Sequence, residues 1–404
     1  MKKTLMGIIG IALIVTGITI IILFNFQGLV ITNPYENVDW ESYGQYKTAL
    51  HVHTFNSDGR ASTDYTVDYH YSQGYNFVAA TDHNYNTNKW SEVENGAMAS
   101  DREEEIMRGE GRDHKPIFPI PYSTEQSLED HVNTFFANFV NEEGMTLEDN
   151  IKKAEEIGGI SHINHPGRYT GGQEGGEEGE NASNNADNIQ KYVDLFMKYP
   201  SCTGMEIINK LDNESRSDRI LWDNILMKTM PSGRNVWGYS NDDSHSLEEI
   251  GYSFNVMLLN KNEFAQNGTA ALYAATDDEI KAQSENNPVR KAMENGAFYA
   301  VSRVDRRENI NADAPPAGTY STLDLLEQPT PSISNIQTDT EQGTITITGA
   351  DYDIIEWIAD GVKISEGNTL NLKDNKDKIN HYYVRAQLKS KTGIAFTQPF
   401  GIKF

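Results

Sequence analysis

Two histidines separated by a single residue are the first feature of this sequence whose spacing suits chemistry. His51 and His53 lie in the stretch HVHTFNSDGR, and Asp58 follows them in a polar turn. Because residues i and i+2 of a strand share one face, both imidazoles can reach the same metal ion. The pair is a weak signal by itself, since packed histidines also occur at this spacing.

Four further segments carry the same residue types at the ends of expected strands: Asp82-His83, Glu125 with His131, His165-Pro166 and Asp243-Ser244-His245. Buried imidazoles and carboxylates are costly without a partner, and divalent cations remove that cost. A mixture of nitrogen and oxygen ligands suits zinc, manganese or iron better than calcium. The absence of cysteine ligands argues against a structural zinc site.

A repeated pattern of a helix, a glycine and a short apolar strand would position these residues. One helix is expected to begin near Ser62 or Thr63 and to stop at Gly74, and the strand 76–80 then leads into Asp82 and His83. The stretches 146–168 and 217–245 repeat the pattern. Helices that alternate with buried strands indicate parallel βα units, whose functional residues gather at the carboxyl ends of the strands.

Seven or eight strands are expected from the apolar runs. They lie near 48–54, 77–82, 117–122, 159–164, 203–208, 235–240, 253–260 and 297–302. The pattern predicts an α/β fold, in the form of a closed or distorted α/β barrel whose rim gathers the candidate ligands.

The stretches HVHTFNSDGR, GYNFVAATDHN, GISHINHPGR and NDDSHS occur in the order typical of one family. Over roughly residues 45–302 the sequence resembles the polymerase and histidinol phosphatase (PHP) family of metal-dependent phosphoesterases. The resemblance implies a distorted (β/α)7-type barrel with two or three divalent metal ions in a rim cleft.

Matching positions imply a ligand set for each metal. The resemblance assigns the first metal to His51, His53, Glu125 and Asp243, the second to His131 and His165 with Glu125 bridging, and the third to Asp58, His83 and His245. Glu129 is the alternative to Glu125. Asp243, His245 and Arg168 are the predicted catalytic residues.

Other polar residues near these positions are expected to support the ligands or the substrate. Glu206 and Asn209 end a strand at the same rim, where they and Asp82 could hold ligand residues by hydrogen bonds. Arg168 and Lys210 could grip a phosphate oxygen, and exposed loop cations are the alternative. The remaining histidines are not expected to bind metal: His70, His114, His162 and His381.

The charge of the chain limits its partners. The sequence has 404 residues and a formal net charge of −25. Such a field repels polyanions, so a nucleic-acid partner is not expected. An anionic substrate then requires local positive charge, which bound metal would supply. The single cysteine, Cys202, cannot form an internal disulfide.

The N-terminal sequence predicts a single-pass membrane anchor. Residues 5–24 form an uncharged apolar run, about the ~20 residues that cross a bilayer as a helix. Lys2 and Lys3 precede the run, which predicts a cytoplasmic N-terminus at 1–4, an anchor over 5–26 and an extracytoplasmic remainder. A cleaved signal peptide is the alternative.

The exported part is expected to have four sections. Residues 27–44 are predicted as a polar stalk, 45–305 as the metallohydrolase domain, 306–330 as a linker and 331–404 as a small immunoglobulin-like β-sandwich. Within the second section, the glycine- and acid-rich tract 171–188 is expected to be an irregular mobile loop, with a lid over the site as the sharper interpretation.

These patterns lead to one functional hypothesis and two alternatives. The leading one is a membrane-anchored hydrolase of phosphate mono- or diesters, in which a hydroxide bridging two metals, its pKa lowered towards ~7, attacks phosphorus. The substrate would be a small phosphate ester or a phosphorylated cell-surface molecule. The alternatives are a carboxyl or carbamate ester hydrolase and a non-catalytic, metal-containing binding module.

Overall fold

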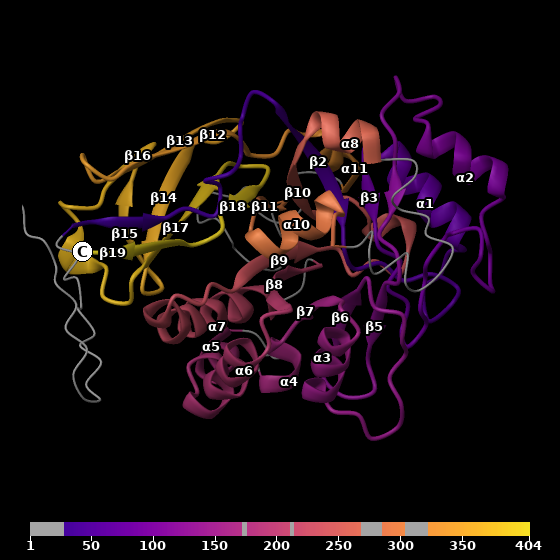
Figure 1. Ribbon diagram of the computed structural model, residues 1–404, viewed down its shortest axis with the longest axis horizontal. Helices are drawn as coiled ribbons and strands as arrows, with labels where there is room; N and C mark the ends of the chain where they lie inside the picture. The colour runs from indigo at the N-terminus through magenta and orange to yellow at the C-terminus, as the bar shows by residue number, and fades with distance from the viewer. Residues whose placement is uncertain (1–27, 172–175, 211–213, 268–284, 304–321) are drawn as a thin grey trace, which may run out of the picture.

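The computed structural model describes residues 28–404 except 172–175, 211–213, 268–284 and 304–321 (Figure 1). The chain has a mixed α/β fold in which strands from distant parts of the sequence share two large sheets. The predicted cytoplasmic segment 1–4 and anchor 5–26 lie outside the described residues. Within the described part, no helix combines the length and apolarity that a membrane span requires.

A five-stranded sheet carries most of the strand ends that matter for the site. Its strands, in spatial order, are β5 (Thr124–Gln126), β6 (Val132–Phe135), β7 (Ile160–Ile163), β8 (Cys202–Asn209) and β9 (Trp237–Asn241). The pairs β7–β8 and β8–β9 are parallel, whereas β5–β6 and β6–β7 are antiparallel. The β5–β6 hairpin was not expected from the sequence.

The second large sheet carries the remaining strand ends. It contains β2 (Tyr43–Ala49), β3 (Phe77–Val78), β4 (Phe118–Pro119), β10 (Ser253–Asn260) and β11 (Phe298–Ser302). The pairs β2–β3 and β3–β4 are parallel, but β10 runs antiparallel to both β2 and β11. The expectation of all-parallel βα units is therefore wrong for both sheets, because each sheet contains antiparallel pairs.

The two sheets meet through isolated bridges placed at candidate ligands. One parallel bridge joins Val52 to Ser244 and another joins His83 to Glu125. The amide of His53 donates to the carbonyl of Ser244 at 2.9 Å, and the amide of Asn84 donates to the backbone carbonyl of Glu125 at 2.9 Å. The two sheets are thus joined where the polar side chains gather, and we call these joined sheets the barrel.

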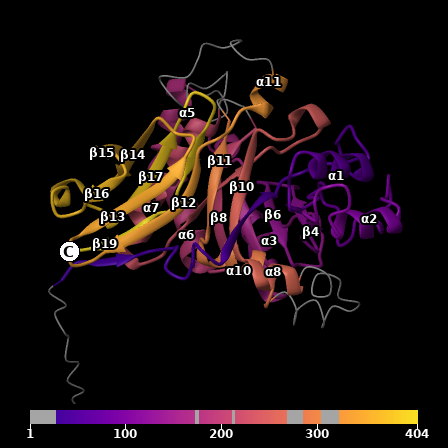
Figure 2. The ribbon, with the colours of Figure 1, turned by 90° about the horizontal axis from the view of Figure 1, so that it is seen from above.

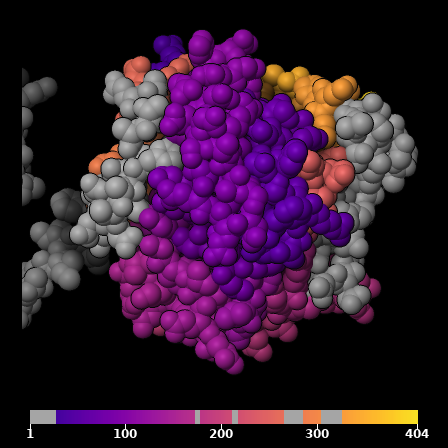
Figure 3. Space-filling view, turned by 90° about the vertical axis from the view of Figure 1, so that its right-hand side faces the viewer, coloured from indigo at the N-terminus to yellow at the C-terminus, as the bar shows by residue number. Residues whose placement is uncertain are grey.

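Helices cover the outside of these sheets. They are α1 (Thr63–Ser72), α2 (Ser100–Met107), α3 (Leu147–Glu156), α4 (Gly167–Thr170), α5 (Gly176–Ser183), α6 (Ala186–Lys198), α7 (Glu214–Thr229), α8 (Lys261–Asn267) and α10 (Pro288–Asn295). Thr146 begins α3 with a capping box, because its hydroxyl accepts from Asp149 while the Asp149 carboxylate accepts from the Thr146 amide. The end of the molecule near α1 and α2 is covered by residues from the N-terminal half of the chain (Figure 3).

The C-terminal strands are hydrogen-bonded to the barrel. They are β12 (Ser332–Asp339), β13 (Thr344–Ala350), β14 (Ile354–Ala359), β15 (Val362–Glu366), β16 (Thr369–Asn371), β17 (Tyr383–Lys389), β18 (Ile394–Phe396) and β19 (Phe400–Lys403). β12, β13 and β16 form a separate antiparallel sheet, while β18 pairs with β11, so that β14, β15, β17, β18 and β19 extend the barrel's own sheet (Figures 1 and 2).

The region expected to be a self-contained sandwich is thus built on a sheet shared with the barrel. The core between its two sheets contains Ile336 and Ile347 on one side and Trp357 and Val384 on the other. The predicted linker contains a short helix, α11 (Thr322–Glu327), and its residues 306–321 lie outside the described part.

The segment expected to be a stalk packs against the rest of the molecule. β1 (Val30–Thr32) pairs with β19, and Tyr35 is buried. The Tyr35 hydroxyl donates to the Phe298 carbonyl at 2.9 Å and accepts from the Gln398 amide at 2.8 Å. Residues 28–44 therefore join the barrel to the C-terminal strands, which corrects the prediction of a free polar stalk.

The tract 171–188 is also more regular than its composition indicates. It contains α5 and the beginning of α6, where the Asn185 side chain accepts from the amides of Asp187 and Asn188. The Ser183 hydroxyl donates to the Ser217 carbonyl of α7 at 2.7 Å. Packing on α7 orders a sequence that has little to bury, and residues 172–175 of the predicted loop lie outside the described part.

The Tyr35 contacts give a first testable prediction. In Tyr35→Phe, the buried Phe298 carbonyl and Gln398 amide lose their partner, so the free energy of unfolding should fall by about 1–3 kcal/mol. Urea denaturation measures this change. Tyr65→Phe is the matched control, because Tyr65 is 68% exposed and should change stability by less than about 0.5 kcal/mol. Equal stabilities of the two variants would contradict the role of Tyr35.

Candidate metal centre

The structure brings all nine predicted ligands into one connected cluster. They form four overlapping groups in which the ligand atoms lie within 4.8 Å of one another: His53, Asp58, His83 and His245; His51, His165 and Asp243; His51, His53 and Glu125; and His83, Glu125 and His131. Each of them comes from a strand end or from the loop that follows it. Segments that lie far apart in the sequence are therefore gathered at one rim.

Several of these strands end in unusual backbone conformations. His165, Asp243 and Lys210 have φ angles of 24°, 45° and 52°, in the left-handed region that non-glycine residues rarely adopt. Such backbone costs about 1–3 kcal/mol per residue and is kept where the surrounding structure enforces it. His165, Lys210 and Asp243 follow β7, β8 and β9, respectively, and this backbone conformation sets the direction of each side chain.

Glu125 occupies the centre of the cluster. Its Oε1 lies 3.1 Å from His51 Nε2 and 3.0 Å from His131 Nδ1, and its Oε2 lies 2.8 Å from His83 Nδ1. Its alternative in the sequence, Glu129, lies elsewhere: the Glu129 carboxylate accepts from the Leu147 amide at the start of α3. The structure thus places Glu125, and not Glu129, among the imidazoles.

Asp243 faces the imidazoles with one oxygen and cations with the other. Its Oδ1 lies 3.2 Å from His51 Nε2 and 3.1 Å from His53 Nε2. Its Oδ2 lies 3.4 Å from Lys210 Nζ and 3.8 Å from an Arg168 guanidinium nitrogen. The two predicted substrate-gripping cations therefore border the cluster on the Asp243 side.

Asp58 lies at the outer edge of the cluster. Its carboxylate is 3.3 Å from His245 Nε2 and 3.6 Å from both His83 Nε2 and His53 Nδ1. The grouping differs from the predicted one in three respects. His53 joins the Asp58 group, His83 also groups with Glu125 and His131, and His165 groups with His51 and Asp243 rather than with His131.

The donor atoms of the cluster fit a divalent cation. His51 Nε2, His53 Nε2, Glu125 Oε2 and Asp243 Oδ1 are buried and, despite their close approach to other polar atoms, form no hydrogen bond of suitable geometry. Ligand atoms about 2.0–2.2 Å from one ion lie about 2.8–3.6 Å from each other in octahedral or tetrahedral coordination, a range that contains the 3.1 Å and 3.2 Å separations around His51 and His53. The mixed imidazole and carboxylate donors suit zinc, manganese or iron.

The charges of the cluster are strongly coupled. Burial would raise the pKa of Glu125 and Asp243, but His51 and the neighbouring imidazoles hold both pKa values well below the ordinary carboxyl range. Burial disfavours a charged His51, but Asp243, Glu125 and Glu206 outweigh it and raise the pKa of His51 well above its ordinary value. Without a metal ion, a proton on His51 partly neutralises the carboxylates.

Glu206 orients His51, one of the predicted ligands, from the position that the sequence indicates. Its Oε1 lies 2.8 Å from His51 Nδ1, and its Oε2 accepts from the His165 amide at 2.8 Å and from Asn209 Nδ2 at 2.9 Å. Burial opposes ionisation, but the neighbouring His51 lowers the pKa of Glu206 to about 2. The contact fixes His51 with Nε2 directed at the cluster.

The Asp82 side chain forms hydrogen bonds with the loop that carries Asp58, rather than with one of the predicted ligands. Its carboxylate accepts from the Thr54 amide at 2.7 Å, from the Thr54 hydroxyl at 2.8 Å and from the Ser57 hydroxyl at 2.8 Å. These bonds hold the turn that carries Asp58.

The sequence did not reveal an amide layer beneath the ligands. Asn164 Nδ2 donates to Glu125 Oε1 at 2.7 Å and to Asn133 Oδ1 at 2.9 Å, while Asn241 Nδ2 donates to Glu206 Oε1 at 2.8 Å. All three asparagines are fully buried. Asn164 directly precedes His165 in the sequence, and this adjacency is the one signal that could have indicated it.

Tyr169 and Ser127 were also missed. The Tyr169 ring lies 5.4 Å from the His131 ring and 5.8 Å from the His165 ring, between centroids. Burial and the nearby Glu125 raise the pKa of Tyr169 far above its ordinary value, so the phenol stays neutral. The Ser127 hydroxyl lies 2.9 Å from His83 Nδ1.

The four other histidines lie outside the cluster. His162 stacks on Tyr239 with centroids 4.6 Å apart, and burial lowers the pKa of His162 to about 4. His70 is buried in α1 with Nδ1 2.8 Å from the Thr66 carbonyl oxygen. His114 lies in an exposed loop, and His381 contacts Asp360 among the C-terminal strands.

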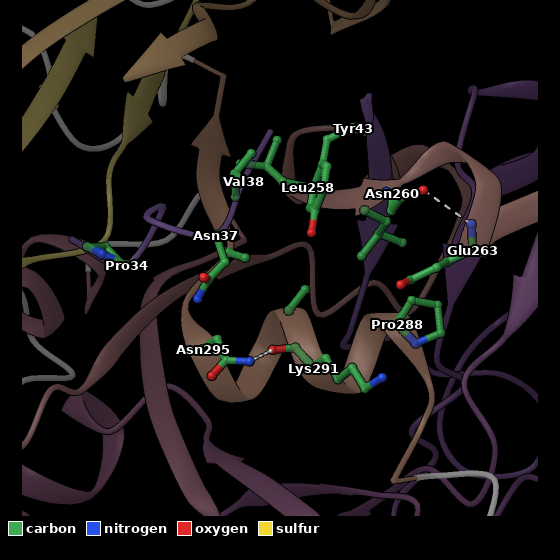
Figure 4. A pocket seen from close by; sticks show the side chains of 13 residues that line it. Pro34, Asn37, Val38, Tyr43, Leu258, Asn260, Glu263, Pro288, Lys291 and Asn295 are labelled. Atoms are coloured by element: carbon green, nitrogen blue, oxygen red, sulfur yellow. Dashed lines mark hydrogen bonds between the residues drawn. The ribbon is translucent and has the colours of Figure 1, made fainter. Parts of the chain in front are cut away.

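A cavity on another part of the surface has a different character (Figure 4). It has a volume of about 190 Å³ and lies between the N-terminal segment, the end of β10 and α10. Asn37, Tyr43 and Glu263 are among its lining residues. None of the predicted site residues lines it, so the cluster at the strand ends remains the candidate site.

Comparisons with known proteins give distant likenesses. No family model and no curated protein matches the chain. One similar solved structure is a two-domain protein from Bacteroides vulgatus containing a predicted PHP-like metal-dependent phosphoesterase, with 17% identity over 91% of this chain and 89% of that chain and a TM-score of 0.39.

Two further structures match over smaller parts. An amidohydrolase from Chromobacterium violaceum, with bound sulfate and no metal, is 14% identical over 49% of this chain and 87% of that chain, with a TM-score of 0.31. A lesion-specific endonuclease from Pyrococcus furiosus is 14% identical over 59% of this chain and 55% of that chain, with a TM-score of 0.29. These values do not assign a family to the chain.

The raised pKa of His51 leads to a prediction about metal binding. A raised pKa keeps His51 protonated at neutral pH in the metal-free protein, and this proton must leave before the imidazole can bind an ion. Titration with Zn²⁺ or Mn²⁺ at pH 7 should therefore release at least one proton, and the affinity should rise as the pH increases through the raised value. Calorimetry in two buffers of different ionisation enthalpy measures the release.

The same titration should stabilise the fold. An ion present at 100 times its Kd adds about 2.7 kcal/mol to the free energy of unfolding, which thermal denaturation detects. His381→Ala is the control and should bind metal as the wild type does, whereas His51→Ala should bind more weakly. If neither the ions nor chelators change the unfolding temperature, the predicted metal site is contradicted.

Proposed function

We propose that this chain is a metal-dependent hydrolase of phosphate esters, either mono- or diesters. The observation that supports the proposal is the convergence of imidazoles and carboxylates from separate strand ends, with two cations beside one of the carboxylates. An all-carboxylate site would suit Mg²⁺ or Ca²⁺, and a cysteine site would suit structural zinc, but this donor set suits a catalytic centre.

The residues that would hold the ions are the nine of the cluster, with Glu125 shared between groups. Divalent ions bound there would lower the pKa of a water molecule towards ~7 and polarise the phosphoryl oxygens. Glu206 would keep His51 in one orientation during this chemistry, and Asn164 would do the same for Glu125.

Neither Ser57 nor Ser127 is placed as a serine nucleophile of the triad type. The Ser57 hydroxyl lies 3.4 Å from His53 Nδ1, but it donates to Asp82 Oδ1 at 2.8 Å. In a triad, the serine and the acid contact opposite nitrogens of the histidine. Here the Ser127 hydroxyl and Glu125 Oε2 both approach the same atom, His83 Nδ1, at 2.9 Å and 2.8 Å. An activated water molecule is therefore the better nucleophile for this site.

Arg168 and Lys210 are suited to bind the charged part of the substrate. Their side chains are about a quarter exposed and share Asp243 Oδ2. On a chain with a net charge of −25, they provide positive charge where an anionic group must approach. The guanidinium fork of Arg168 matches two phosphoryl oxygens, and Lys210 contributes a point charge.

We also propose that the enzyme acts at the outer face of a membrane on a small phosphate ester or a phosphorylated cell-surface molecule. The support is in the sequence: the apolar run at 5–24 follows two lysines. The described chain begins beside β19, so an anchor preceding residue 28 would join the molecule at its C-terminal strands.

A substrate screen tests the reaction class. Purified protein loaded with Mn²⁺ or Zn²⁺ should hydrolyse a phosphate mono- or diester. Hydrolysis of carboxyl or carbamate esters alone would favour the alternative hydrolase. A stoichiometric metal load without any turnover would overturn the proposal in favour of a binding module.

Alanine at His83 or Asp243 should abolish turnover, because each residue belongs to the cluster. Each variant should remain folded by circular dichroism and should bind fewer metal ions by elemental analysis. His70→Ala is a control for histidine loss outside the cluster, and it should retain turnover if it folds. Wild-type activity in His83→Ala or Asp243→Ala would contradict the site.

Removal of the two cations should affect charged substrates selectively. In the double variant Arg168→Met with Lys210→Met, kcat/KM for the phosphate ester should fall by about 100-fold or more, since fixed charges that stabilise the transition state are lost. A neutral ester, if it is hydrolysed at all, should lose much less. Lys363→Met on β15 is the control. Equal losses on charged and neutral substrates would rule out an anion-binding role.

A further inference from the structure

Helix α7 packs on β8 of the five-stranded sheet and lies near the C-terminal strands (Figures 1 and 2). Its buried residues Leu221, Trp222 and Ile225 share one apolar core with Tyr383 of β17 and Phe396 of β18. The helix also packs on β8, whose end carries Glu206 and Lys210 at the site. Helix α7 thus contacts both the five-stranded sheet and the C-terminal strands.

On the side of the site, α7 holds the turn that follows His165. Asp218 is fully buried, and its Oδ1 accepts from the Gly167 amide at 2.7 Å. Gly167 begins α4, and the next residue is Arg168. The Asp218 contact therefore fixes the start of the turn that carries Arg168 and follows a strained His165.

On the opposite side, α7 is held by a buried ion pair. Arg385 of β17 donates to Asp223 through Nε at 2.9 Å and through an Nη at 2.7 Å, and the Tyr383 hydroxyl donates to the same carboxylate at 3.0 Å. The side chains of Arg385 and Asp223 are 4% and 7% exposed. The Arg385 guanidinium also lies 5.0 Å from the Trp222 ring.

The two anchor points are close together along the helix. Asp218 and Asp223 are five residues apart, which corresponds to about 7.5 Å of helix. A bidentate arginine–carboxylate pair restricts both the distance and the orientation of its partners. Because the pair is buried, solvent does not screen it. A shift of α7 at Asp223 would therefore move Asp218 and the Gly167 turn.

We propose that the C-terminal sheet positions the metal centre through α7. Arg385 and Tyr383 hold Asp223, and the same helix holds the turn of Gly167 and Arg168 through Asp218. Arg385 is then a positioning residue for the site, and the C-terminal strands are part of its scaffold rather than an attachment module. The kinetic consequences of this proposal rest on the proposed hydrolase function, whereas its structural consequences do not.

A purely stabilising ion pair is the alternative, and a double variant separates the two roles. Asp223→Leu with Arg385→Met removes both charges, and replacement of a whole buried pair by apolar residues is often neutral for stability. If the pair only stabilises the fold, this variant should lose only stability, since the Tyr383 hydroxyl loses its acceptor, and exchange at Gly167 should stay as in the wild type. If the pair positions the site, the variant should stay folded but loosen the turn.

Hydrogen–deuterium exchange of the full chain measures the loosening without any turnover. The peptide that contains Gly167 should exchange several-fold faster in the double variant. The Gly167 amide donates to Asp218, so its protection depends on the position of α7. The control is Glu356→Gln with Lys389→Met, which removes another mostly buried pair from the same sheet, joined at 3.3 Å. Exchange near Gly167 should be unchanged in this control.

The kinetic arm uses the phosphate ester identified in the substrate screen. The double variant should raise KM or lower kcat/KM by about tenfold at full metal occupancy, as expected when residues that support a site are lost. Arg385→Lys keeps the charge but loses the fork, and should give an intermediate effect even if the double variant folds poorly.

A folded double variant with wild-type exchange at Gly167 would overturn the proposal, as would wild-type exchange in Arg385→Lys if the double variant does not fold. If the wild-type chain hydrolyses none of the tested esters, the proposed function fails, and the exchange measurement still decides whether the sheet positions the turn.

Discussion

The cluster depends on two carboxylates that are buried among imidazoles. Glu125 and Asp243 are almost fully inaccessible to water, and both carry oxygens without a hydrogen-bond partner. A buried anion must be neutralised by a proton, a positive side chain or a metal ion. The bridges at His83–Glu125 and Val52–Ser244 bring the strand ends close enough for these carboxylates and the imidazoles to share charge.

The surrounding structure maintains this arrangement through polar contacts in an otherwise apolar barrel. Buried amides and Glu206 direct the ligand atoms, and the strained backbone at His165 and Asp243 turns them inwards. Such networks are favourable only when nearly all members are satisfied. The buried atoms without a hydrogen-bond partner include five on the predicted ligands: His51 Nε2, His53 Nε2, His165 Nδ1, Glu125 Oε2 and Asp243 Oδ1. An ion bound there would complete the network.

The sequence predicted the mixed α/β class and several strand ends well, because apolar runs such as 77–82 and 159–164 lead directly into His83 and His165. It did not predict the β5–β6 hairpin, since the strands TEQ and VNTF have no apolar pattern. β1 and the burial of Tyr35 were missed because their partners lie more than 260 residues away. Local composition also misjudged α5, which tertiary contacts order. The grouping of ligands around each ion depended on side-chain directions that spacing alone does not contain, and metal binding itself stays a prediction.

The pairing of β11 with β18 has a consequence for how this chain can be divided. Ala300 and Val301 share backbone hydrogen bonds with Phe396 and Ala395, so β18 covers an edge of the barrel's sheet. A fragment ending near residue 330 would leave that edge unpaired beside newly exposed apolar side chains of α7, and bare edges of this kind recruit other chains. Chains that lack the C-terminal strands would therefore self-associate. A chimera that replaces these strands must supply a new strand that pairs with β11.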